Sequence, residues 1–508
     1  MSSGSQGLNS PDDTHSTSGQ ESPNSERGQD DILDSPRAGT RVIQGTVVRS
    51  AGYFAGVGLA LISAPLLTRH LGVDDYGSFV VVGSLVAIAV IFADAGMTAA
   101  GIREYSVRDA AGQARLLQNI VAARLAASVL AGAGAVVFAF AAGYDQLLVA
   151  GAALGAVGLV LTIAQRTYAI PLWVALRLEL TTALDLLRQA LTVAGIVVLV
   201  VAGAGLLAFF ILPIPVAIAV LVATLVVVRD YGGIRPSVER EEWLLLLGEV
   251  PAAVASMLGA LFYRVAIIMM SLLGTSKETG YYGLSLGVVD VFIPVATLIA
   301  GSAFPILARA ADTDRQRLGF AFRQLFDVAV IIGIGTAFIL VAGAGPIVLF
   351  LGGPDFEPTV PVLRIQGLAV AATFLVTLFG YMLWVVRARR QLVIGNLFGL
   401  AAAVGLTAAL IPRWEAQGAA LAMLVAESSL AAWLGVALLG NRPDLRPQLR
   451  TVAKASVAVI VAACIALAPF PPLVGVTVGT AAYLVVLLVL RAIPIDIWRA
   501  TVGAWRAR

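Results

Sequence analysis

Five ionisable side chains lie deep inside apolar stretches of this 508-residue chain: Asp94, Arg124, Arg264, Asp290 and Glu427. In hydrocarbon, an ionisable group costs at least ~2.5–3.5 kcal/mol by insertion scales, so each must face a partner charge or water. Asp94 with Arg124, and Arg264 with Asp290, can form ion pairs that hold helices together. The same groups can instead line a polar cavity that receives a charged or hydroxyl-rich molecule. The residue types and spacing leave both interpretations open.

The depth of these groups follows from their distance to the ends of the apolar runs. Asp94 and Arg124 each lie about seven residues from one end of a run, roughly 10 Å deep at 1.5 Å per residue. Arg264 and Asp290 each lie about ten residues from the opposite end of theirs, roughly 15 Å deep and near the middle of a bilayer. Glu427 is similarly central.

The composition indicates that a lipid bilayer surrounds these charges. Hydrophobic residues make up 59% of the chain and charged residues 13%, against ~25% in an ordinary soluble domain, so the excess apolar surface must face lipid.

The single cysteine, Cys464, and the two histidines, His15 and His70, supply poor material for a disulfide, a metal site or histidine chemistry. We therefore expect no cofactor and no metal. The pI near 9.1 does not indicate nucleic acid, because the basic residues lie in short loops between apolar runs.

Fourteen apolar runs are long enough to span a membrane, for which about 20 residues are needed. They predict an all-α membrane protein with about fourteen transmembrane helices. The least certain boundary is the small Gly/Ala bend between the fifth and sixth runs. The runs lie near 46–68, 79–101, 118–141, 146–165, 184–203, 205–228, 249–273, 281–306, 325–343, 361–386, 391–411, 417–439, 452–468 and 473–491.

The segments outside these runs set the orientation. Residues 1–40 are rich in Ser, Asp, Gly and Pro and predict a disordered cytoplasmic tail without a signal peptide. With the N-terminus in the cytoplasm, only Arg69, Lys277 and Arg413 fall in outer loops, which predicts N-in and C-in topology in the cell (inner) membrane. The loops are too short for an extramembrane catalytic domain.

Four stretches resemble bacterial polysaccharide-biosynthesis flippases. Residues 63–106 are similar to their first two helices, with the pattern P-x-x-T-R-x-L-G-x-x-x-Y-G, and residues 271–309 to their seventh and eighth helices. Residues 349–369 resemble the ninth-to-tenth connection, and 396–427 the eleventh and twelfth helices. The resemblance covers about 41–440, in order. The residues in the motif positions are Pro65, Thr68, Arg69, Leu71, Gly72, Tyr76, Gly77, Gly96, Arg103, Gly274, Gly280, Tyr281, Pro305, Arg309 and Gly418.

This resemblance implies the fold of multidrug/oligosaccharidyl-lipid/polysaccharide exporters, with two six-helix lobes around a central cavity. We expect the lobes at 41–228 and 229–440, followed at 441–508 by two additional helices and a short basic cytoplasmic tail. Both halves carry a Leu-Gly…Tyr-Gly signature, at 71–77 and 273–283, as an internal repeat would.

The function implied by the resemblance is not enzymatic. It is the flipping of a polyprenyl-(pyro)phosphate-linked oligosaccharide to the outer leaflet by alternating access. The five intramembrane charges are the candidate substrate contacts, with Arg264 and Arg124 on phosphate or acidic sugars and the carboxylates on sugar hydroxyls or a coupling cation. Family members often carry an Asp two residues after the Arg of the seventh helix. Here Ala266 follows Arg264 in that place, which puts ion coupling there in doubt.

Other functions and partners stay open. A lipid II flippase or a drug/cation exporter of the same superfamily is the nearest alternative, although a drug exporter usually stops at twelve helices. A membrane polymerase, ligase or glycosyltransferase would need a larger outer loop than this chain offers. The expected partners are membrane lipid and the lipid-linked oligosaccharide. A coupling cation and a polysaccharide polymerase or glycosyltransferase are further candidates.

Overall fold

A computed structural model describes residues 36–229, 236–240, 242–243, 250–447, 449–469 and 471–492. The chain divides into two units, Met1–Gln44 and Gly45–Arg508, and the contacts below are those of the second. Most of the predicted N-terminal tail (1–35) and of the basic C-terminal tail (493–508) lies outside the described residues. Residues 36–40 belong to the first helix and not to a disordered tail.

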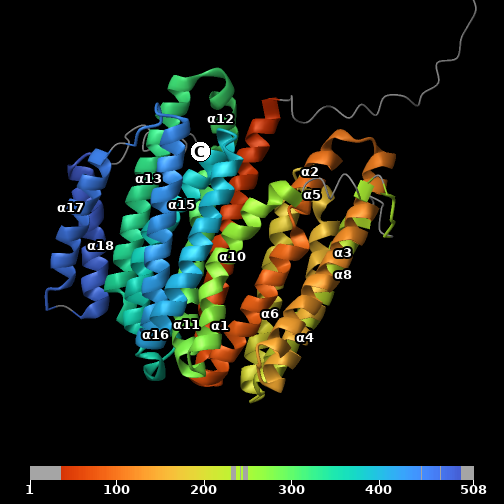
Figure 1. The fold of residues 1–508 in the computed structure, drawn as a ribbon, viewed down its shortest axis with the longest axis horizontal. Helices are drawn as coiled ribbons and strands as arrows, with labels where there is room; N and C mark the ends of the chain where they lie inside the picture. The colour runs from red at the N-terminus through yellow and green to blue at the C-terminus, as the bar shows by residue number, and fades with distance from the viewer. Residues whose placement is uncertain are drawn as a thin grey trace, which may run out of the picture. The chain divides into compact units, whose positions relative to one another are not determined.

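All regular structure in the described ranges is helical, as the sequence predicts, and Figure 1 shows the arrangement of the helices. The elements are α1 (Pro36–Asp94), α2 (Met97–Val107), α3 (Ala110–Ala141), α4 (Gln146–Tyr168), α5 (Ile170–Val174), α6 (Leu178–Val201), α7 (Leu206–Ile211), α8 (Pro213–Val228), α10 (Val250–Leu273), α11 (Ser276–Asp290), α12 (Phe292–Thr313), α13 (Arg315–Ala342), α14 (Ala344–Leu351), η2 (Pro354–Phe356), α15 (Thr359–Val385), α16 (Arg389–Asn441), α17 (Leu449–Ala466) and α18 (Pro472–Val489).

Polar caps and prolines mark where several of these helices begin. Asp109, Asp145 and Asp314 are the N-cap residues of α3, α4 and α13, and each carboxylate accepts a hydrogen bond from a backbone N–H of the first turn. Pro213 occupies the first position of α8, where its missing N–H leaves no hydrogen bond unmade. These local signals explain why the helices begin at these residues.

α1 and α16 each contain two arms joined at one non-helical residue. In α1 this residue is Gly72 (φ 72°, ψ −177°), and in α16 it is Glu415 (φ 49°, ψ −129°). Glycine adopts a positive φ without steric cost, so Gly72 is suited to the sharp reversal between the first arm of α1 (36–71) and its second arm (73–94). Eleven described helices are long and apolar enough to cross a membrane, and α1 and α16 each supply two arms. The number fourteen and the N-in, C-in orientation stay predictions.

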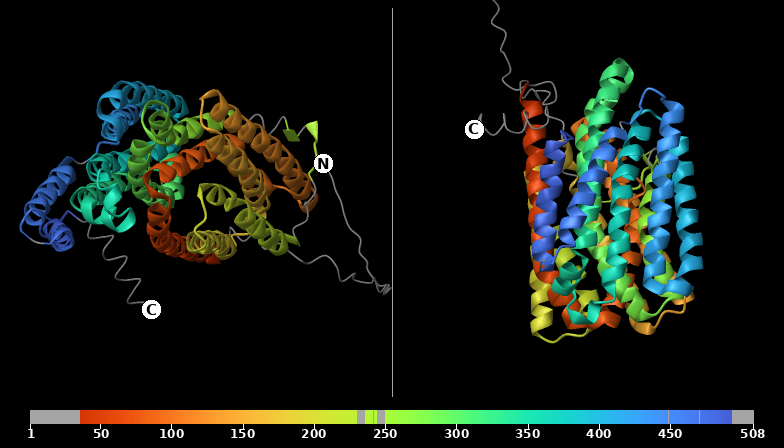
Figure 2. Two further views of the ribbon diagram at one scale, coloured as in Figure 1. Left: turned by 90° about the horizontal axis from the view of Figure 1, so that it is seen from below. Right: turned by 90° about the vertical axis from the view of Figure 1, so that its left-hand side faces the viewer.

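Helix packing falls into groups along the chain. α3 and α4 pack together, and α4 also contacts α7 and α8. α15 contacts α11, α12, α13 and α16, while α10 packs against α16; α17 and α18 pack on each other and against α13. Figure 2 shows the pair α17–α18 at one side of this arrangement. We retain the lobes at 41–228 and 229–440 and the pair after 441 as a proposed division.

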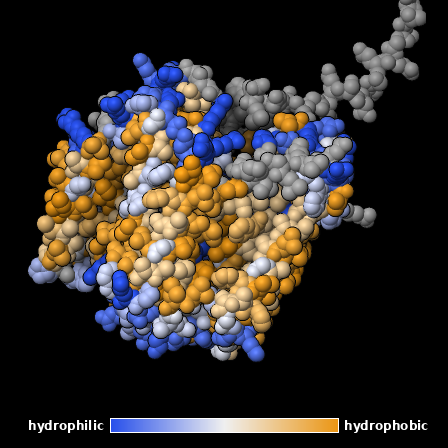
Figure 3. Space-filling model, in the orientation of Figure 1, coloured by the Kyte–Doolittle hydropathy of each residue, from blue (hydrophilic) through white to orange (hydrophobic). Residues whose placement is uncertain are grey.

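The surface matches a protein that spans a membrane. In the view of Figure 3, apolar side chains cover the middle of the helices and hydrophilic side chains gather toward their two ends. Large apolar side chains such as Leu130 (74% exposed) and Phe140 (77% exposed) would be costly in water and are favourable against lipid. The chain is therefore a multi-pass membrane protein.

At one end of the helices, at the bottom of Figure 1, α1 and α11 cross very tightly. A Cβ atom added to Gly280 would lie 2.2 Å from the carbonyl oxygen of Val73, and one added to Gly77 would lie 2.9 Å from the backbone nitrogen of Gly280. Arg69 Nη2 donates to the carbonyl oxygen of Phe350 at 2.9 Å at the same end. Backbone thus meets backbone where both Leu-Gly…Tyr-Gly signatures lie.

Candidate functional site

A polar cavity of about 700 Å³ lies between α1, α2, α4, α5, α6 and α10. It lies toward the end of the second arm of α1 that carries Asp94, away from the reversal at Gly72. On the predicted orientation, this is the cytoplasmic side. Met257 and Ala260 of α10 form part of its wall. The polar residues that line it are Asp94, Thr98, Gln165, Arg166, Thr181 and Asp185.

Asp94 and Arg124 form an ion pair at one wall of this cavity. Arg124 Nη2 lies 2.6 Å from Asp94 Oδ1, which also accepts a hydrogen bond from the Thr98 hydroxyl. The Asp94 side chain is 34% exposed, whereas the Arg124 side chain is 0% exposed. Nε and Nη1 of Arg124 are buried and lack a hydrogen-bond partner in the part of the chain that the structure describes. In this conformation Asp94 therefore faces the cavity and Arg124 supports it from behind.

This asymmetry predicts unequal effects on stability. Asp94→Asn leaves the buried Arg124 charge without a counter-ion, a situation that costs about 3–5 kcal/mol in buried pairs. Arg124→Gln leaves only a partly exposed carboxylate, which water can solvate. We expect Asp94→Asn to lower the melting temperature of the purified protein in detergent clearly more than Arg124→Gln does. Equal losses would show that solvent reaches both members of the pair.

Arg166 is a cavity residue that sequence reasoning missed. The fourth apolar run was predicted to end at 165, which placed Arg166 in a loop, but α4 continues to Tyr168 and carries Arg166 in its last turn. The side chain is exposed in the cavity, and no hydrogen bond or ion pair to another described residue engages it. It lies close enough to Arg124 and Arg188 to interact with both electrostatically. The sequence signal that could have identified Arg166 as a cavity residue is an arginine directly after an apolar run.

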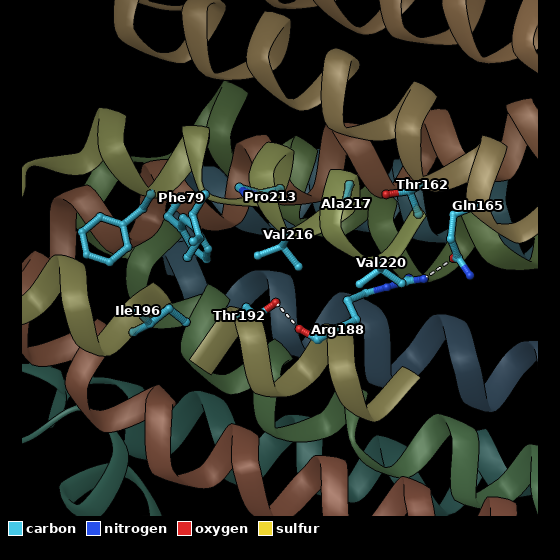
Figure 4. Close-up of a pocket in the computed structure, with 12 residues that line it drawn as sticks. Phe79, Thr162, Gln165, Arg188, Thr192, Ile196, Pro213, Val216, Ala217 and Val220 are labelled. Atoms are coloured by element: carbon cyan, nitrogen blue, oxygen red, sulfur yellow. Dashed lines mark hydrogen bonds between the residues drawn. The ribbon is translucent and has the colours of Figure 1, made fainter. Parts of the chain in front are cut away.

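A smaller cavity of about 140 Å³ adjoins the first through Gln165 (Figure 4). Arg188 reaches from α6 to donate to Gln165 Oε1, and Gln165 Nε2 donates to the Thr224 hydroxyl at 3.0 Å. The spacing of Asp185 and Arg188 suggests a local pair, but among the described residues no ion pair joins them. Arg188 is instead held by α4, which leaves the Asp185 carboxylate on the wall of the larger cavity.

Arg264 and Asp290 form the second ion pair, between α10 and α11. Arg264 Nη1 lies 2.8 Å from Asp290 Oδ2, and the two side chains are 26% and 28% exposed. Asp290 Oδ1 is buried without a hydrogen-bond partner in the described ranges. Neither residue is among those that line the 700 Å³ cavity, but Arg264 follows Met257 and Ala260, which do, at helical spacing and one turn deeper along α10. The structure thus brings the two residues together, as their predicted depths suggested.

Glu427 is buried between helices and does not line the 700 Å³ cavity. It is 4% exposed inside the packing of α15 and α16, and its Oε2 accepts a hydrogen bond of 2.6 Å from the Thr373 hydroxyl. Nearby, the Ser285 hydroxyl donates to Gln366 Oε1 at 2.5 Å. The central depth predicted for Glu427 therefore leads to a buried network and not to the wall of the 700 Å³ cavity.

Comparisons with known proteins agree with this geometry. A family model described as "Polysaccharide biosynthesis protein" matches residues 66–361, more than half of the chain. A search of curated proteins found no match.

Solved structures share the fold at low sequence identity. A lipid II flippase, MurJ, in an inward closed conformation superposes with a TM-score of 0.69 at 12% identity, covering 88% of this chain and 99% of its own. An inward-facing multidrug resistance MATE transporter of the MOP superfamily superposes with a TM-score of 0.62 at 16% identity, and the match covers 79% of this chain and 98% of the transporter. An outward-facing MATE transporter superposes with a TM-score of 0.54 at 13% identity, and the match covers 79% of this chain and 95% of the transporter. These likenesses confirm the exporter fold.

Proposed function

This chain belongs to the polysaccharide biosynthesis protein family, and from that premise we propose that it flips a polyprenyl-(pyro)phosphate-linked oligosaccharide across the cell (inner) membrane. The direction is from the cytoplasmic to the outer leaflet, to supply cell-surface polysaccharide biosynthesis. The similar solved structures are a flippase and transporters, so the proposal includes no enzymatic step.

The observation that carries this proposal is a charged cavity inside an otherwise apolar protein. A cavity of about 700 Å³ is large enough to hold sugars, and it offers two carboxylates and Arg166, which forms no ion pair with another described residue. A sugar–pyrophosphate head group is too polar to cross hydrocarbon unaided, because its groups would lose their hydrogen bonds with water. Two lobes that rock around such a cavity avoid that cost.

The candidate residues take different places in this proposal. Asp94 and Arg166 contact the head group directly, and Arg124 acts as a positioning residue because it is fully buried behind Asp94. Arg264 and Asp290 form the deeper step of the path. Glu427 lies outside the cavity, which favours a coupling cation over sugar hydroxyls as its ligand.

An apolar groove gives the polyprenyl tail a place beside the cavity. The groove has a volume of about 640 Å³ and lies between the second arm of α1, α3 and α10. Residues 90, 91 and 94 of α1 line the polar cavity, while residues 85, 88, 89 and 92 line the groove, so one helix separates the two spaces. A lipid with a polar head and an apolar tail can then occupy both sides of this helix at once.

The test is transport by the purified protein in proteoliposomes. A fluorescent polyprenyl-pyrophosphate oligosaccharide should lose head-group accessibility on one face of the vesicle only when the protein is present. Proton and sodium gradients are supplied in separate arms, with protein-free vesicles as the control. Movement of lipid II alone would assign the protein as a lipid II flippase. Failure to move any lipid-linked glycan, in a folded protein, would shift the assignment to a drug or cation exporter.

A further inference from the structure

Trp173 places an aromatic ring in the same cavity as Arg166 and Asp185. It lies on the short helix α5 and lines the cavity of about 700 Å³. Arg49 from the first arm of α1 lies over its ring, with the guanidinium carbon 4.4 Å from the centroid. Arg49 and Asp185 also line a neighbouring cavity of about 360 Å³. The indole is therefore held in place by a cation–π contact while it remains part of the cavity wall.

Two of the arginines around this cavity are engaged by other side chains, and Arg49 lies over the indole of Trp173. The guanidinium of Arg124 is paired with Asp94, and that of Arg188 donates to Gln165. Arg166 is exposed in the cavity, and no ion pair to a described residue neutralises it. The cavity lining thus brings together the guanidinium of Arg166, the indole of Trp173 and the carboxylate of Asp185.

We propose that Trp173, Arg166 and Asp185 form a subsite that binds one sugar ring carrying an anionic group. The inference rests on the proposed function and adds which part of the substrate these residues read. The apolar face of a sugar ring packs on an indole, a large and rigid apolar surface. The guanidinium binds phosphate or carboxylate oxygens through paired N–H donors, and the carboxylate accepts hydrogen bonds from sugar hydroxyls. The anion is either the phosphate that links the sugar to the lipid or the carboxylate of an acidic sugar.

The competing explanation is that Trp173 only joins helices. A second pair, Arg389 over Trp384 at 5.4 Å, provides a matched control because it lies at the junction of α15 and α16 and does not line this cavity. Arg364, exposed in α15 and also outside the cavity lining, is the matched control for Arg166. If the indole serves packing alone, losing it should resemble the loss of Trp384.

The experiment measures equilibrium binding to the full-length protein in nanodiscs, without transport. The probe is a fluorescent short-chain prenyl-pyrophosphate disaccharide, and the competitors are inorganic pyrophosphate, glucuronate and glucose. We expect Trp173→Leu to weaken probe binding at least ~10-fold, or about 1.4 kcal/mol, while leaving competition by pyrophosphate unchanged. Arg166→Gln should weaken both probe and pyrophosphate, and Arg166→Lys should recover part of the affinity. Trp384→Leu and Arg364→Gln should bind like wild type.

Each outcome decides a separate point. Competition by pyrophosphate but not glucuronate assigns the anion as the linking phosphate, and the reverse assigns it as an acidic sugar. Equal probe affinity in Trp173→Leu and Trp384→Leu would overturn the sugar contact. An unchanged affinity in Arg166→Gln would overturn the anion contact. Because the readout is binding, a protein that binds the probe but flips no lipid would contradict the proposed function and leave this subsite intact.

Discussion

Arg264→Ala is expected to abolish transport of the lipid-linked oligosaccharide while the amount of folded protein in the membrane stays unchanged. Arg264 lies on α10 one turn beyond Ala260, which lines the cavity, and its side chain is 26% exposed. In the proposed path its guanidinium contacts a head group that moves deeper. Its loss also removes the partner of Asp290 Oδ2, while Asp290 Oδ1 already lacks a hydrogen-bond partner among the described residues. We expect the initial rate of transport in proteoliposomes to fall at least ~10-fold, which corresponds to a rise of about 1.4 kcal/mol in the activation free energy.

A charge exchange separates a substrate contact from a structural ion pair. The double variant Arg264→Asp/Asp290→Arg keeps two opposite charges between α10 and α11, where the wild-type atoms lie 2.8 Å apart. A pair that only joins helices should work in either order, so the double variant would regain transport. A guanidinium that contacts phosphate must stay on α10, so transport should remain lost. Recovery to the wild-type rate would exclude the proposed role of Arg264, and a melting temperature near wild type would verify folding.

The fold class was predictable from the sequence because apolar run length is a strong constraint in a membrane. The ion pairs were also predictable in outline, since helices of opposite direction bring Arg264 and Asp290 to the same depth. Exposure was not predictable. Nothing in the spacing distinguishes Arg124, which is fully buried, from Asp94, which lines the cavity. That difference arises from which neighbouring helix covers each residue, and such packing is set by the tertiary structure.

Two residues of the candidate site, Arg166 and Trp173, were not predicted, because the sequence does not show which residues the tertiary structure places in the cavity. Arg166 and Trp173 lie just beyond an apolar run, where hydropathy ends a span but the chain continues as α4 and α5. Charged and aromatic residues lower hydropathy precisely where a helix lines a polar cavity, so a method based on apolar length ends the helix too early there. Glu427 shows the opposite case, because its central depth predicted a place in a cavity, whereas the structure buries it against Thr373.

Gly280→Ala is expected to separate α1 and α11 at the tight crossing that they make in this structure. The new methyl group would lie 2.2 Å from the carbonyl oxygen of Val73, a backbone atom that can move away only if α1 and α11 separate. The Tyr-Gly of the first signature thus has a physical reason, since Gly77 and Gly280, which lies within the second signature, allow two backbones to touch. In the proposed alternating-access cycle α1 and α11 must come together at this end, so transport should fall at least ~10-fold.

Gly83→Ala is the matched control, because Gly83 lies on the same arm of α1 and an added Cβ there meets no atom within 4 Å. The state of the cavity can be followed with a cysteine at Ile102, which lines it, after the native Cys464 is replaced by Ala. A membrane-impermeant maleimide should label Ile102→Cys more slowly in Gly280→Ala, because opening one end of a rocking transporter closes the other. Labelling and transport equal to those of Gly83→Ala would mean that α1 and α11 tolerate the methyl group, and the crossing would then not control access.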